Sequence, residues 1–289
     1  MTGEPLRRTT LVTGATGHQG GAVLAALLRR GERVRGLVRD PEEARASALA
    51  QLGVELVGGD LLDSSELASA MRGVDGAFGL TIPGKDPEHE LAQGRALIAA
   101  AREVGLPHLV LASVASASEA PEVPHFASKA QLESLAADSG VPTTVIAPTW
   151  FFENLLTHRA QIASGTMALA LPSDRPLQAL ALADLGELVA TVLAHGPYPG
   201  GRRIELAGDE LTPAELAGAL SQVVGVEIRH QQLSLSDLGA PTSDLPAMYA
   251  FLARSGYHVD ILGLRKEFPD VGWHRFREWA AEQQWPRAR

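Results

Sequence analysis

Three glycines near the amino terminus, Gly14, Gly17 and Gly20, have the type and the spacing that suit the binding of a pyrophosphate. The apolar run at residues 9–12 predicts a buried strand before them, and the run at residues 22–28 predicts a helix after them. A strand that turns directly into a helix needs glycine where a Cβ would block the turn, the approach of a phosphate or the packing of the helix on the strand. The first N–H groups of the helix and its dipole then favour a bound phosphate.

The glycine spacing alone is a weak signal, but the strand and the helix flank it as a dinucleotide-binding turn requires. This context argues against the alternative of a glycine-rich turn without a ligand. We therefore predict that the turn holds the phosphates of a dinucleotide. Its predicted cofactor-binding residues are Gly14, Thr16, Gly17, His18, Gln19 and Gly20.

The end of the next predicted strand, residues 33–39, indicates which dinucleotide is bound. A carboxylate at that strand end hydrogen-bonds the 2′-hydroxyl of NAD, whereas an arginine accommodates the 2′-phosphate of NADP. The strand ends at Arg39, and Asp40 with Pro41 predicts the cap and the first residue of a helix. With Asp40 engaged as the cap, the guanidinium of Arg39 favours NADP(H). The alternative is that Arg39 is only a solvated charge at a strand end.

Two further strand ends are predicted to contact the cofactor, from their position in the fold alone. The residues after the third strand are placed to contact the adenine, and those that end the fourth strand lie along the cofactor. Both sets could equally be ordinary strand ends. They are Asp60 and Leu61 after the third strand, and Gly79, Leu80 and Thr81 at the end of the fourth.

The elements that position these residues alternate regularly in the first half of the chain. Strands that are apolar enough to be buried on both faces, each followed by a helix, predict an α/β fold with a Rossmann-type, doubly wound parallel sheet. Strands are predicted at 9–12, 33–39, 54–57, 74–81, 108–113 and 142–147, and helices at 22–28, 63–71, 88–104 and 127–138, with a further helix opening at Asp40.

Beyond about residue 148 the alternation stops, and prolines and glycines become frequent. We therefore predict an NAD(P)-binding domain at residues 1–150 and a smaller C-terminal α+β lobe at residues 151–289, with the chain interleaving between the two. The lobe would wall a cleft for a substrate or a partner. Its strands are predicted at 203–206 and 226–233, and its helices at 184–194, 212–224, 244–254 and 273–284.

The composition of the 289-residue chain argues against several classes of function. A hydrophobic content of 45% suffices for a sizeable core, and a formal net charge of −9 argues against direct nucleic-acid binding. The absence of cysteine excludes disulfides and thiol catalysis, and the histidines lack metal-ligand spacing, so we expect no metal site. No signal peptide precedes the first strand, and no apolar run approaches about 18 residues. We therefore expect a cytoplasmic protein without a membrane span.

The sequence resembles the NmrA-like branch of the atypical short-chain dehydrogenase/reductases over nearly its whole length. The segments that carry the resemblance are 13–21, 38–41, 58–61, 124–129, 148–154, 183–186, 205–209 and 256–261, of which 148–154 with its aromatic residues is the most specific. The resemblance implies a Rossmann domain that binds NADP(H), with Arg39 at the adenosine phosphate. It also implies that Lys129 lies near the nicotinamide ribose, and that Phe151 to Asn154 lie beside the nicotinamide.

The sequence departs from the active enzymes of the wider superfamily at the position of their proton donor. Those enzymes carry a tyrosine four residues before the lysine, and its phenol donates or accepts the proton. Here His125 occupies that position relative to Lys129. The position of the companion serine falls on Val114, with Ser113 one residue earlier. These departures argue against ordinary alcohol dehydrogenase chemistry.

Two hypotheses for the function remain. In the first, the protein is an NADPH-dependent reductase of a small-molecule acceptor such as a quinone, with Lys129 and His125 as the catalytic residues. A histidine can supply a proton near neutral pH, although His125 could equally be a helix-start residue without a chemical role. In the second, the protein is an NADP(H) redox sensor that regulates a protein partner such as a transcription factor. A homodimer is compatible with either hypothesis, and the retention of Lys129 favours the reductase.

Overall fold

The computed structural model describes residues 7–82, 87–239 and 244–286, and the chain divides into two compact units. The first unit comprises Met1–Ser113, Ser128–Ala147 and Leu185–Ile204, and the second comprises Val114–Ala127, Pro148–Asp184 and Glu205–Arg289. The chain thus passes between the units several times, and the segment Leu185–Ile204 lies in the first unit rather than in a C-terminal lobe.

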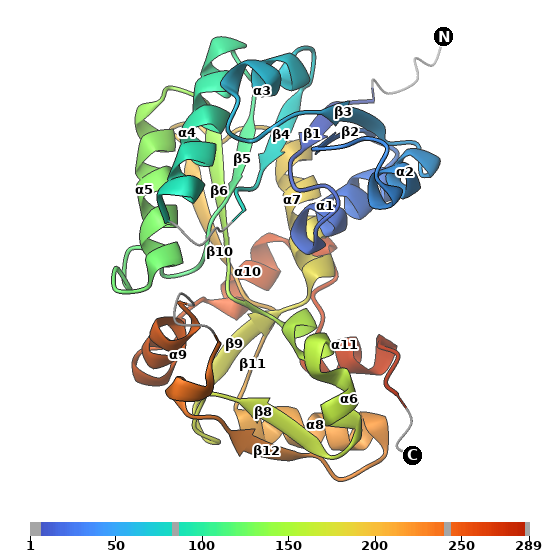
Figure 1. Ribbon diagram of the computed structural model, residues 1–289, viewed down its shortest axis with the longest axis vertical. Helices are drawn as coiled ribbons and strands as arrows, with labels where there is room; N and C mark the ends of the chain where they lie inside the picture. The colour runs from blue at the N-terminus through green and yellow to red at the C-terminus, as the bar shows by residue number, and fades with distance from the viewer. Residues whose placement is uncertain (1–6, 83–86, 240–243, 287–289) are drawn as a thin grey trace. The chain divides into compact units, whose positions relative to one another are not determined.

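The first unit is built on a seven-stranded sheet (Figure 1). Its strands are β1 (Thr9–Val12), β2 (Arg33–Val38), β3 (Glu55–Gly58), β4 (Gly76–Gly79), β5 (Leu109–Ala112), β6 (Thr143–Pro148) and β10 (Arg202–Leu206). They lie in the order β10-β6-β5-β4-β1-β2-β3, and the pairings from β3 to β6 are parallel. This arrangement confirms the predicted doubly wound parallel sheet. Its order reverses between β1 and β4, where such sheets bind ligands at the carboxyl ends of their strands.

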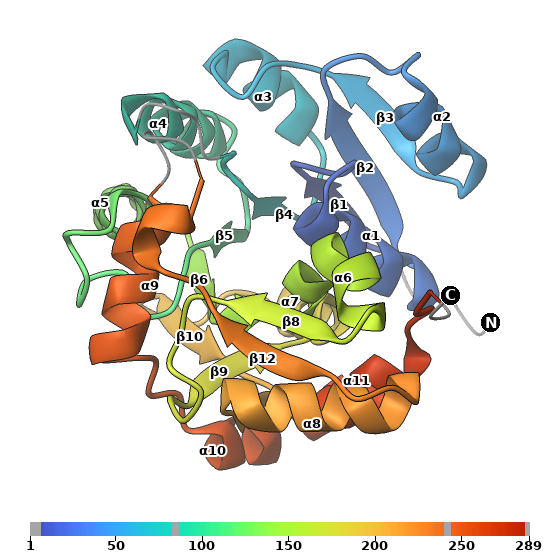
Figure 2. The same ribbon diagram turned by 60° about the horizontal axis from the view of Figure 1, so that its bottom comes forward.

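Helices cover both faces of this sheet. They are α1 (His18–Arg29), α2 (Ala44–Gln51), α3 (Ser64–Met71), α4 (Pro87–Glu103), α5 (Pro124–Asp138) and α7 (Leu182–His195). Figure 1 and Figure 2 show α1, α2 and α7 on one face and α3, α4 and α5 on the other. Helix α7 can approach α1 closely because Gly186 has no side chain: a Cβ there would lie 2.4 Å from the carbonyl oxygen of Ala22.

The core under α3, α4 and α5 is aliphatic. The strands β4 and β5 are buried at every position, as expected for strands covered on both faces. Buried members of this cluster include Leu11, Leu67, Met71, Leu97, Leu109 and Leu111. Burial of these side chains is the main stabilising contribution to the sheet on which the predicted site is built.

The second unit contains two small sheets and the helices around them. The strands β7 (Trp150–Phe151), β9 (Leu177–Leu180) and β11 (Asp209–Leu211) form one sheet in the order β11-β9-β7, and β8 (Thr166–Leu169) pairs in parallel with β12 (Arg229–Gln232). The helices are α6 (Arg159–Ala163), α8 (Pro213–Val224), α9 (Leu245–Arg254), α10 (Ile261–Glu267) and α11 (Phe276–Glu282), with 3-10 helices η1 (Phe152–His158), η2 (Leu235–Asp237) and η3 (Pro269–Val271). The predicted capping box of Thr212 and Glu215 begins α8.

Several predicted element boundaries were wrong. Helix α1 begins at His18, four residues before the predicted start, and α5 begins at Pro124 rather than at residue 127. Helix α11 spans only Phe276–Glu282 of the predicted 273–284. Strand β10 joins the seven-stranded sheet instead of a separate lobe. None of the helices within the described ranges is long and apolar enough to cross a membrane.

The predicted helix cap at Asp40 was also wrong. Helix α2 begins at Ala44 with Glu43 at the N-cap position, and Asp40 lies in the turn before it. There the carboxylate of Asp40 accepts a hydrogen bond from the N–H of Glu42 at 2.9 Å. Asp40 is therefore engaged in a local turn, which short polar side chains favour because they reach the backbone two residues on.

His108 is a buried histidine at the start of β5 whose protonation should destabilise the first unit. Its side chain is only 2% exposed, and its Nε2 is 2.9 Å from the hydroxyl of Thr144. Burial, together with the charges of His195 and Arg8, lowers the pKa of His108 to about 4. The unfolded chain takes up this proton near pH 6.5, so the stabilisation is complete above that pH and is lost as the pH falls towards 4.

We therefore expect His108→Gln to remove part of the acid sensitivity. Between pH 7 and pH 5 the free energy of unfolding of the parent should fall by about 1–2 kcal/mol more than that of the variant, measured by urea unfolding at each pH. The same substitution at the exposed His158 serves as the control and should leave the pH dependence of the parent unchanged. Equal pH dependence in the parent and in His108→Gln would contradict the assignment.

Candidate functional site

The glycine turn between β1 and α1 has the geometry of an anion-binding helix start. Gly14 has a φ of +62°, a left-handed conformation that favours glycine, and its carbonyl oxygen accepts the N–H of Gly17 at 2.9 Å. Helix α1 has Gly17 at its N-cap position, without a side-chain cap and without an acidic residue in the first turn. The positive end of the helix dipole and its first N–H groups are therefore not neutralised by a carboxylate of the helix itself.

Among the glycines of this turn, Gly20 is the one at which a side chain would overlap the backbone most severely. A Cβ there would lie 2.2 Å from the carbonyl oxygen of Gly14 and 2.9 Å from that of Thr13, both of them backbone atoms. Glycine therefore allows α1 to begin directly against the end of β1. Of the other predicted turn residues, Thr16, Gly17 and His18 are exposed and Gln19 is half-buried. Within the described part of the chain, the buried Oε1 of Gln19 has no hydrogen-bond partner.

The end of β4 is joined directly to this turn. The hydroxyl of Thr13 accepts the N–H of Leu80 at 2.7 Å and donates to the carbonyl oxygen of Leu80 at 2.9 Å. The side chain of Leu80 also packs against Gly14, where a Cβ would lie 2.9 Å from Leu80 Cδ2. The predicted residues Leu80 and Thr81 are thus held beside the glycine turn by contacts within the first unit.

Lys129 lies next to Thr81 in a buried polar cluster. Its Nζ donates to the hydroxyl of Thr81 at 2.7 Å and forms an ion pair with Glu90 Oε1 at 2.9 Å. Glu90 Oε1 also accepts the hydroxyl of Thr81 at 2.9 Å, and Oε2 accepts that of Ser128 at 2.5 Å. The lysine is only 6% exposed and the glutamate 2%. The cluster brings together β4, α4 and α5.

The two charges of this pair respond differently to burial. Burial raises the pKa of Glu90, but the charge of Lys129 and the hydrogen bonds from Ser128, Lys129 and Thr81 outweigh it, so the pKa lies below its ordinary value. Burial lowers the pKa of Lys129, and the carboxylates of Glu90 and Glu133 oppose this change. Glu90 is therefore ionised at neutral pH, and its carboxylate opposes the lowering of the Lys129 pKa.

The remaining predicted residues of the first unit lie at strand ends. Arg39 is exposed immediately after β2, and it makes no hydrogen bond or ion pair with any residue that the structure describes. Asp60 is exposed, and its carboxylate accepts the N–H of Leu62 at 2.9 Å, whereas Leu61 is buried. Gly79 makes room for packing, because a Cβ there would lie 2.5 Å from Leu97 Cδ2. The structure thus gives Gly79 a role in the core.

His125 lies in the first turn of α5, one turn before Lys129, and its contacts belong to the second unit. Its Nδ1 is hydrogen-bonded to the carboxylate of Asp244, and its ring packs edge-to-face on Phe126 with centroids 4.7 Å apart. The hydrogen bond from His125 lowers the pKa of Asp244, so the carboxylate is ionised and Nδ1 carries the proton. The ring is therefore held in one orientation and one tautomer.

Ser113, one residue before the position of the superfamily's companion serine, is engaged elsewhere. It is buried, and its hydroxyl donates to Glu133, which also pairs with Arg203 at 2.8 Å. Val114 occupies the serine position itself and is half-buried. The residues that replace the tyrosine and the serine of the active enzymes are thus a histidine held by a carboxylate and an aliphatic side chain.

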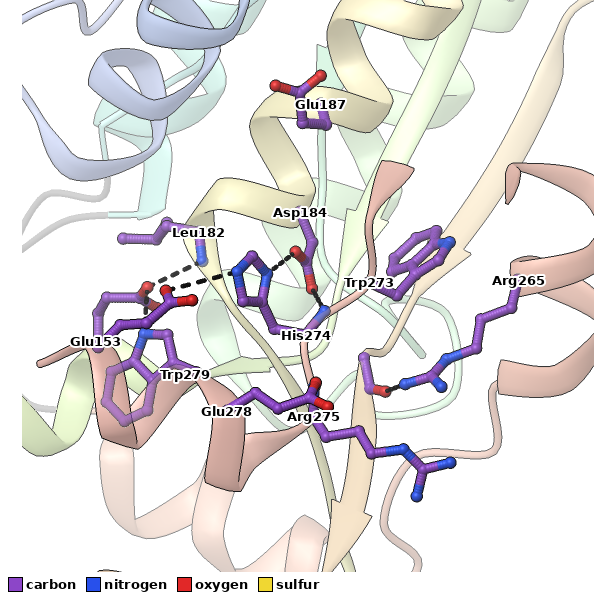
Figure 3. Close-up of polar contacts among 12 residues, drawn as sticks. Glu153, Leu182, Asp184, Glu187, Arg265, Trp273, His274, Arg275, Glu278 and Trp279 are labelled. Atoms are coloured by element: carbon purple, nitrogen blue, oxygen red, sulfur yellow. Dashed lines mark hydrogen bonds and ion pairs between the residues drawn. The ribbon is translucent and has the colours of Figure 1, made fainter. Parts of the chain in front are cut away.

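The segment predicted beside the nicotinamide is fixed by a polar network of the second unit (Figure 3). Phe151 ends β7, and Asn154 is exposed on η1. Between them, Glu153 Oε1 accepts the backbone N–H of Leu182 and the indole N–H of Trp279, each at 3.0 Å. These contacts hold the start of η1 against α11.

The same network contains an unusual carboxylate at the start of α7. Asp184 is fully buried and accepts two hydrogen bonds from His274, one from Nδ1 at 2.5 Å and one from the backbone N–H at 3.0 Å (Figure 3). Burial raises the pKa of Asp184 to about 6, and burial also raises that of Glu153. Burial opposes protonation of His274, but the hydrogen bond and charge of Asp184, with the charges of Glu282 and Glu278, raise its pKa.

Sequence reasoning missed the partners of the predicted residues. Glu90 pairs with Lys129 and is itself held by Ser128, and Asp244 holds His125, but the sequence analysis singled out neither Glu90 nor Asp244. The one available signal was a polar pattern on the otherwise apolar face of 88–104, where Glu90 and Gln93 are buried. Among the described residues, no cluster of three or more histidine, aspartate or glutamate side chains could hold a metal ion.

Comparison with known proteins places this chain in a family. The model of the NmrA-like family matches residues 7–261. The (4-alkanoyl-5-oxo-2,5-dihydrofuran-3-yl)methyl phosphate reductase of Streptomyces griseus subsp. griseus is 32% identical over 286 residues, which cover 94% of this chain and 96% of the relative. Quinone oxidoreductase 2 of Escherichia coli is 28% identical over 232 residues, which cover 79% of each chain.

Solved structures agree with this match. The NADPH complex of the same Escherichia coli quinone oxidoreductase has a TM-score of 0.79 at 26% sequence identity, and the match covers 94% of this chain and 98% of that one. NmrA, a negative transcriptional regulator, has a TM-score of 0.80 at 22% identity, over 96% and 95% of the two chains. At that identity the likeness to NmrA shows the fold alone.

The glycine turn predicts a sharp difference between two neighbouring positions. Gly20→Ala should lower the free energy of unfolding by about 1–3 kcal/mol, because its Cβ would overlap the backbone of Gly14. Gly21→Ala is the matched control, since its Cβ would meet only the carbonyl oxygen of Ala15 at an ordinary 3.7 Å. Alanine at position 21 should be neutral or stabilising by up to about 1 kcal/mol. Equal urea unfolding curves for the two variants would contradict the close approach at Gly20.

Proposed function

This chain belongs to the NmrA-like family, and we propose that it binds NADP(H) and reduces a quinone-like, conjugated small-molecule acceptor. The observation that carries the proposal is the glycine turn, where α1 begins against the carbonyl of Gly14 and leaves its first N–H groups without a side-chain cap. The buried Oε1 of Gln19, which has no partner in the described chain, adds an unsatisfied polar group to the same turn. Both features suit the phosphates and hydroxyls of a dinucleotide.

Arg39 would select NADP(H) over NAD(H). Its guanidinium is exposed at the carboxyl end of β2, the strand that meets the adenosine ribose in this fold. Asp40, the carboxylate that could instead favour NAD, already accepts the N–H of Glu42. An arginine can bind a phosphate by two parallel hydrogen bonds, which gives the 2′-phosphate a strong and specific partner.

Lys129 would bind the nicotinamide ribose. Two N–H groups of its ammonium point to Thr81 and Glu90, and the third, for which no partner is found among the described residues, would bond a ligand near the carboxyl end of β4. Thr81 follows Leu80, which is bonded to Thr13 beside the glycine turn. A cofactor that lay from the turn along this strand end would reach the lysine within the first unit.

The reaction would convert NADPH, a proton and a quinone into NADP⁺ and a quinol. When bound, NADPH supplies the hydride. A quinone that accepts hydride needs little acid catalysis, so the absence of a tyrosine at position 125 is compatible with this chemistry. His125 would deliver the proton, with Asp244 fixing its tautomer so that the proton passed on leaves from Nε2.

The relatives support a reductase of a conjugated acceptor. One is a reductase of a dihydrofuranyl methyl phosphate, and another is a quinone oxidoreductase whose structure was determined with NADPH. The alternative is a redox sensor that binds NADP(H) and regulates a protein partner. The missing tyrosine favours this alternative, and the fold is shared with the regulator NmrA.

Two measurements on the same preparation separate the alternatives. We expect NADPH binding in the micromolar range by fluorescence titration and NADPH oxidation, followed at 340 nm, with at least one member of a panel of quinones and unsaturated lactones. Lys129→Met should reduce both, because it removes the ammonium that would bind the ribose. Binding of NADPH without turnover by any acceptor would favour the sensor, and the absence of binding would contradict both.

Arg39→Ala tests the choice of cofactor. We expect the affinity for NADPH to fall by about 10- to 100-fold, the effect of losing charge-assisted hydrogen bonds, whereas the affinity for NADH should change little. Arg102→Ala, at an exposed arginine in the last turn of α4, is the control and should alter neither affinity. An unchanged ratio of NADPH to NADH affinity in Arg39→Ala would remove Arg39 from the site.

A further inference from the structure

Glu90 and Lys129 form an ion pair that is almost fully removed from solvent, with side-chain exposures of 2% and 7%. Removing two charges from water is unfavourable unless each finds good partners in the protein. A lysine needed only to contact a cofactor could lie at the surface, where its charge is stabilised by water. Contact between Lys129 and a cofactor therefore does not by itself explain why this ion pair is buried.

The carboxylate of Glu90 is oriented by residues on two further elements. Thr81, two residues after β4, donates to Oε1 at 2.9 Å, and Ser128, on α5, donates to Oε2 at 2.5 Å. Thr81 also accepts a hydrogen bond from Lys129 at 2.7 Å, so carboxylate, hydroxyl and ammonium form a closed set of contacts. The direction of the Lys129 ammonium is fixed by this set, because Glu90 cannot rotate without losing its donors.

The other titratable side chains near Lys129 on α5 have partners of their own. Glu133 lies one turn after Lys129 on α5, but it pairs with Arg203 at 2.8 Å and accepts the hydroxyl of Ser113. On the other side of Lys129 along the helix, His125 is bonded to Asp244. Glu90 is thus the carboxylate in direct contact with the ammonium. Burial lowers the pKa of Lys129, and Glu90 provides the main opposition to that change.

We propose that Glu90 is a positioning residue, which keeps the buried ammonium of Lys129 charged and directs it to the carboxyl end of β4, where it meets the nicotinamide ribose. This inference rests on the proposed NADP(H)-binding function. Ser128 and Thr81 orient Glu90, and an N–H of Lys129 beyond those bonded to Thr81 and Glu90 would donate to a ribose hydroxyl. The acidic residue on α4 therefore sets the charge state of the residue on α5.

Glu90→Gln tests this inference through a pH profile. The amide has nearly the same shape but no charge, so Lys129 should lose its proton at a lower pH than in the parent. We expect NADPH affinity at pH 8 to be at least tenfold weaker than in the parent and to recover towards the parent value at pH 6. An affinity that matches the parent at both pH values, or that is weaker by the same factor at both, would overturn the proposal.

Two further variants separate this role from a purely structural one. Glu88→Gln makes the same substitution two residues away on α4, at a side chain that is 69% exposed, and should bind NADPH as the parent does at every pH. The double variant Glu90→Gln/Lys129→Met removes both buried charges, so its melting temperature should recover relative to Glu90→Gln while its NADPH affinity stays low. Parent-like NADPH affinity in the double variant would also overturn the proposal.

A measurement on the parent protein, without cofactor, keeps the proposal testable if Glu90→Gln does not fold. The lysines of the chain are Lys85, Lys129 and Lys266, so 13Cε-lysine labelling gives a simple NMR spectrum in which Lys129→Met assigns the signal. We expect Lys129 to remain charged from pH 6 to pH 8 in the parent. Deprotonation within that range would overturn the proposal. Failure of the proposed function would appear differently, as a parent that binds no NADPH while Lys129 remains charged.

Discussion

The contact between the start of α1 and the end of β1 is the constraint on which the predicted site depends. A Cβ at Gly20 would lie 2.2 Å from the carbonyl oxygen of Gly14, so the helix can begin at His18 only because this position is glycine. The early start of the helix directs its N–H groups to the carboxyl ends of the strands. Thr13 then ties the end of β4 to the same turn through Leu80. A displacement of α1 would therefore affect both ends of the predicted cofactor site.

The second constraint is electrostatic, and it concerns Lys129. The core under α3, α4 and α5 is aliphatic and β4 and β5 are buried, so a charge beyond the end of β4 is stable only where polar partners surround it. Glu90 and Thr81 supply these partners, and Ser128 orients the carboxylate of Glu90. The packing of α4 and α5 on the sheet therefore determines the position of the ammonium beside the carboxylate of Glu90.

The local parts of this arrangement were predictable from the sequence, and the long-range parts were not. Apolar strands alternating with helices predicted the doubly wound sheet, which the structure confirms, and the match of residues 7–261 confirms the resemblance to the NmrA-like family. The pairing of Glu90 with Lys129 joins residues on separate helices, and no spacing in the sequence reveals it. The sequence predicted that the chain interleaves between the two parts, but not that β10 joins the seven-stranded sheet, because local patterns do not show where a chain returns to an earlier sheet.

The missing tyrosine and the buried glutamate have a common interpretation. In the active enzymes of the wider superfamily, the lysine lowers the pKa of a neighbouring tyrosine, so its charge acts on the proton donor. Here the corresponding residue is His125, whose ring is oriented by Asp244, and Lys129 is bound to Glu90 instead. In the proposed function, this charge would hold a ribose rather than activate a phenol. Such an arrangement would suit the proposed quinone-like acceptor, which takes hydride readily and needs a proton only afterwards.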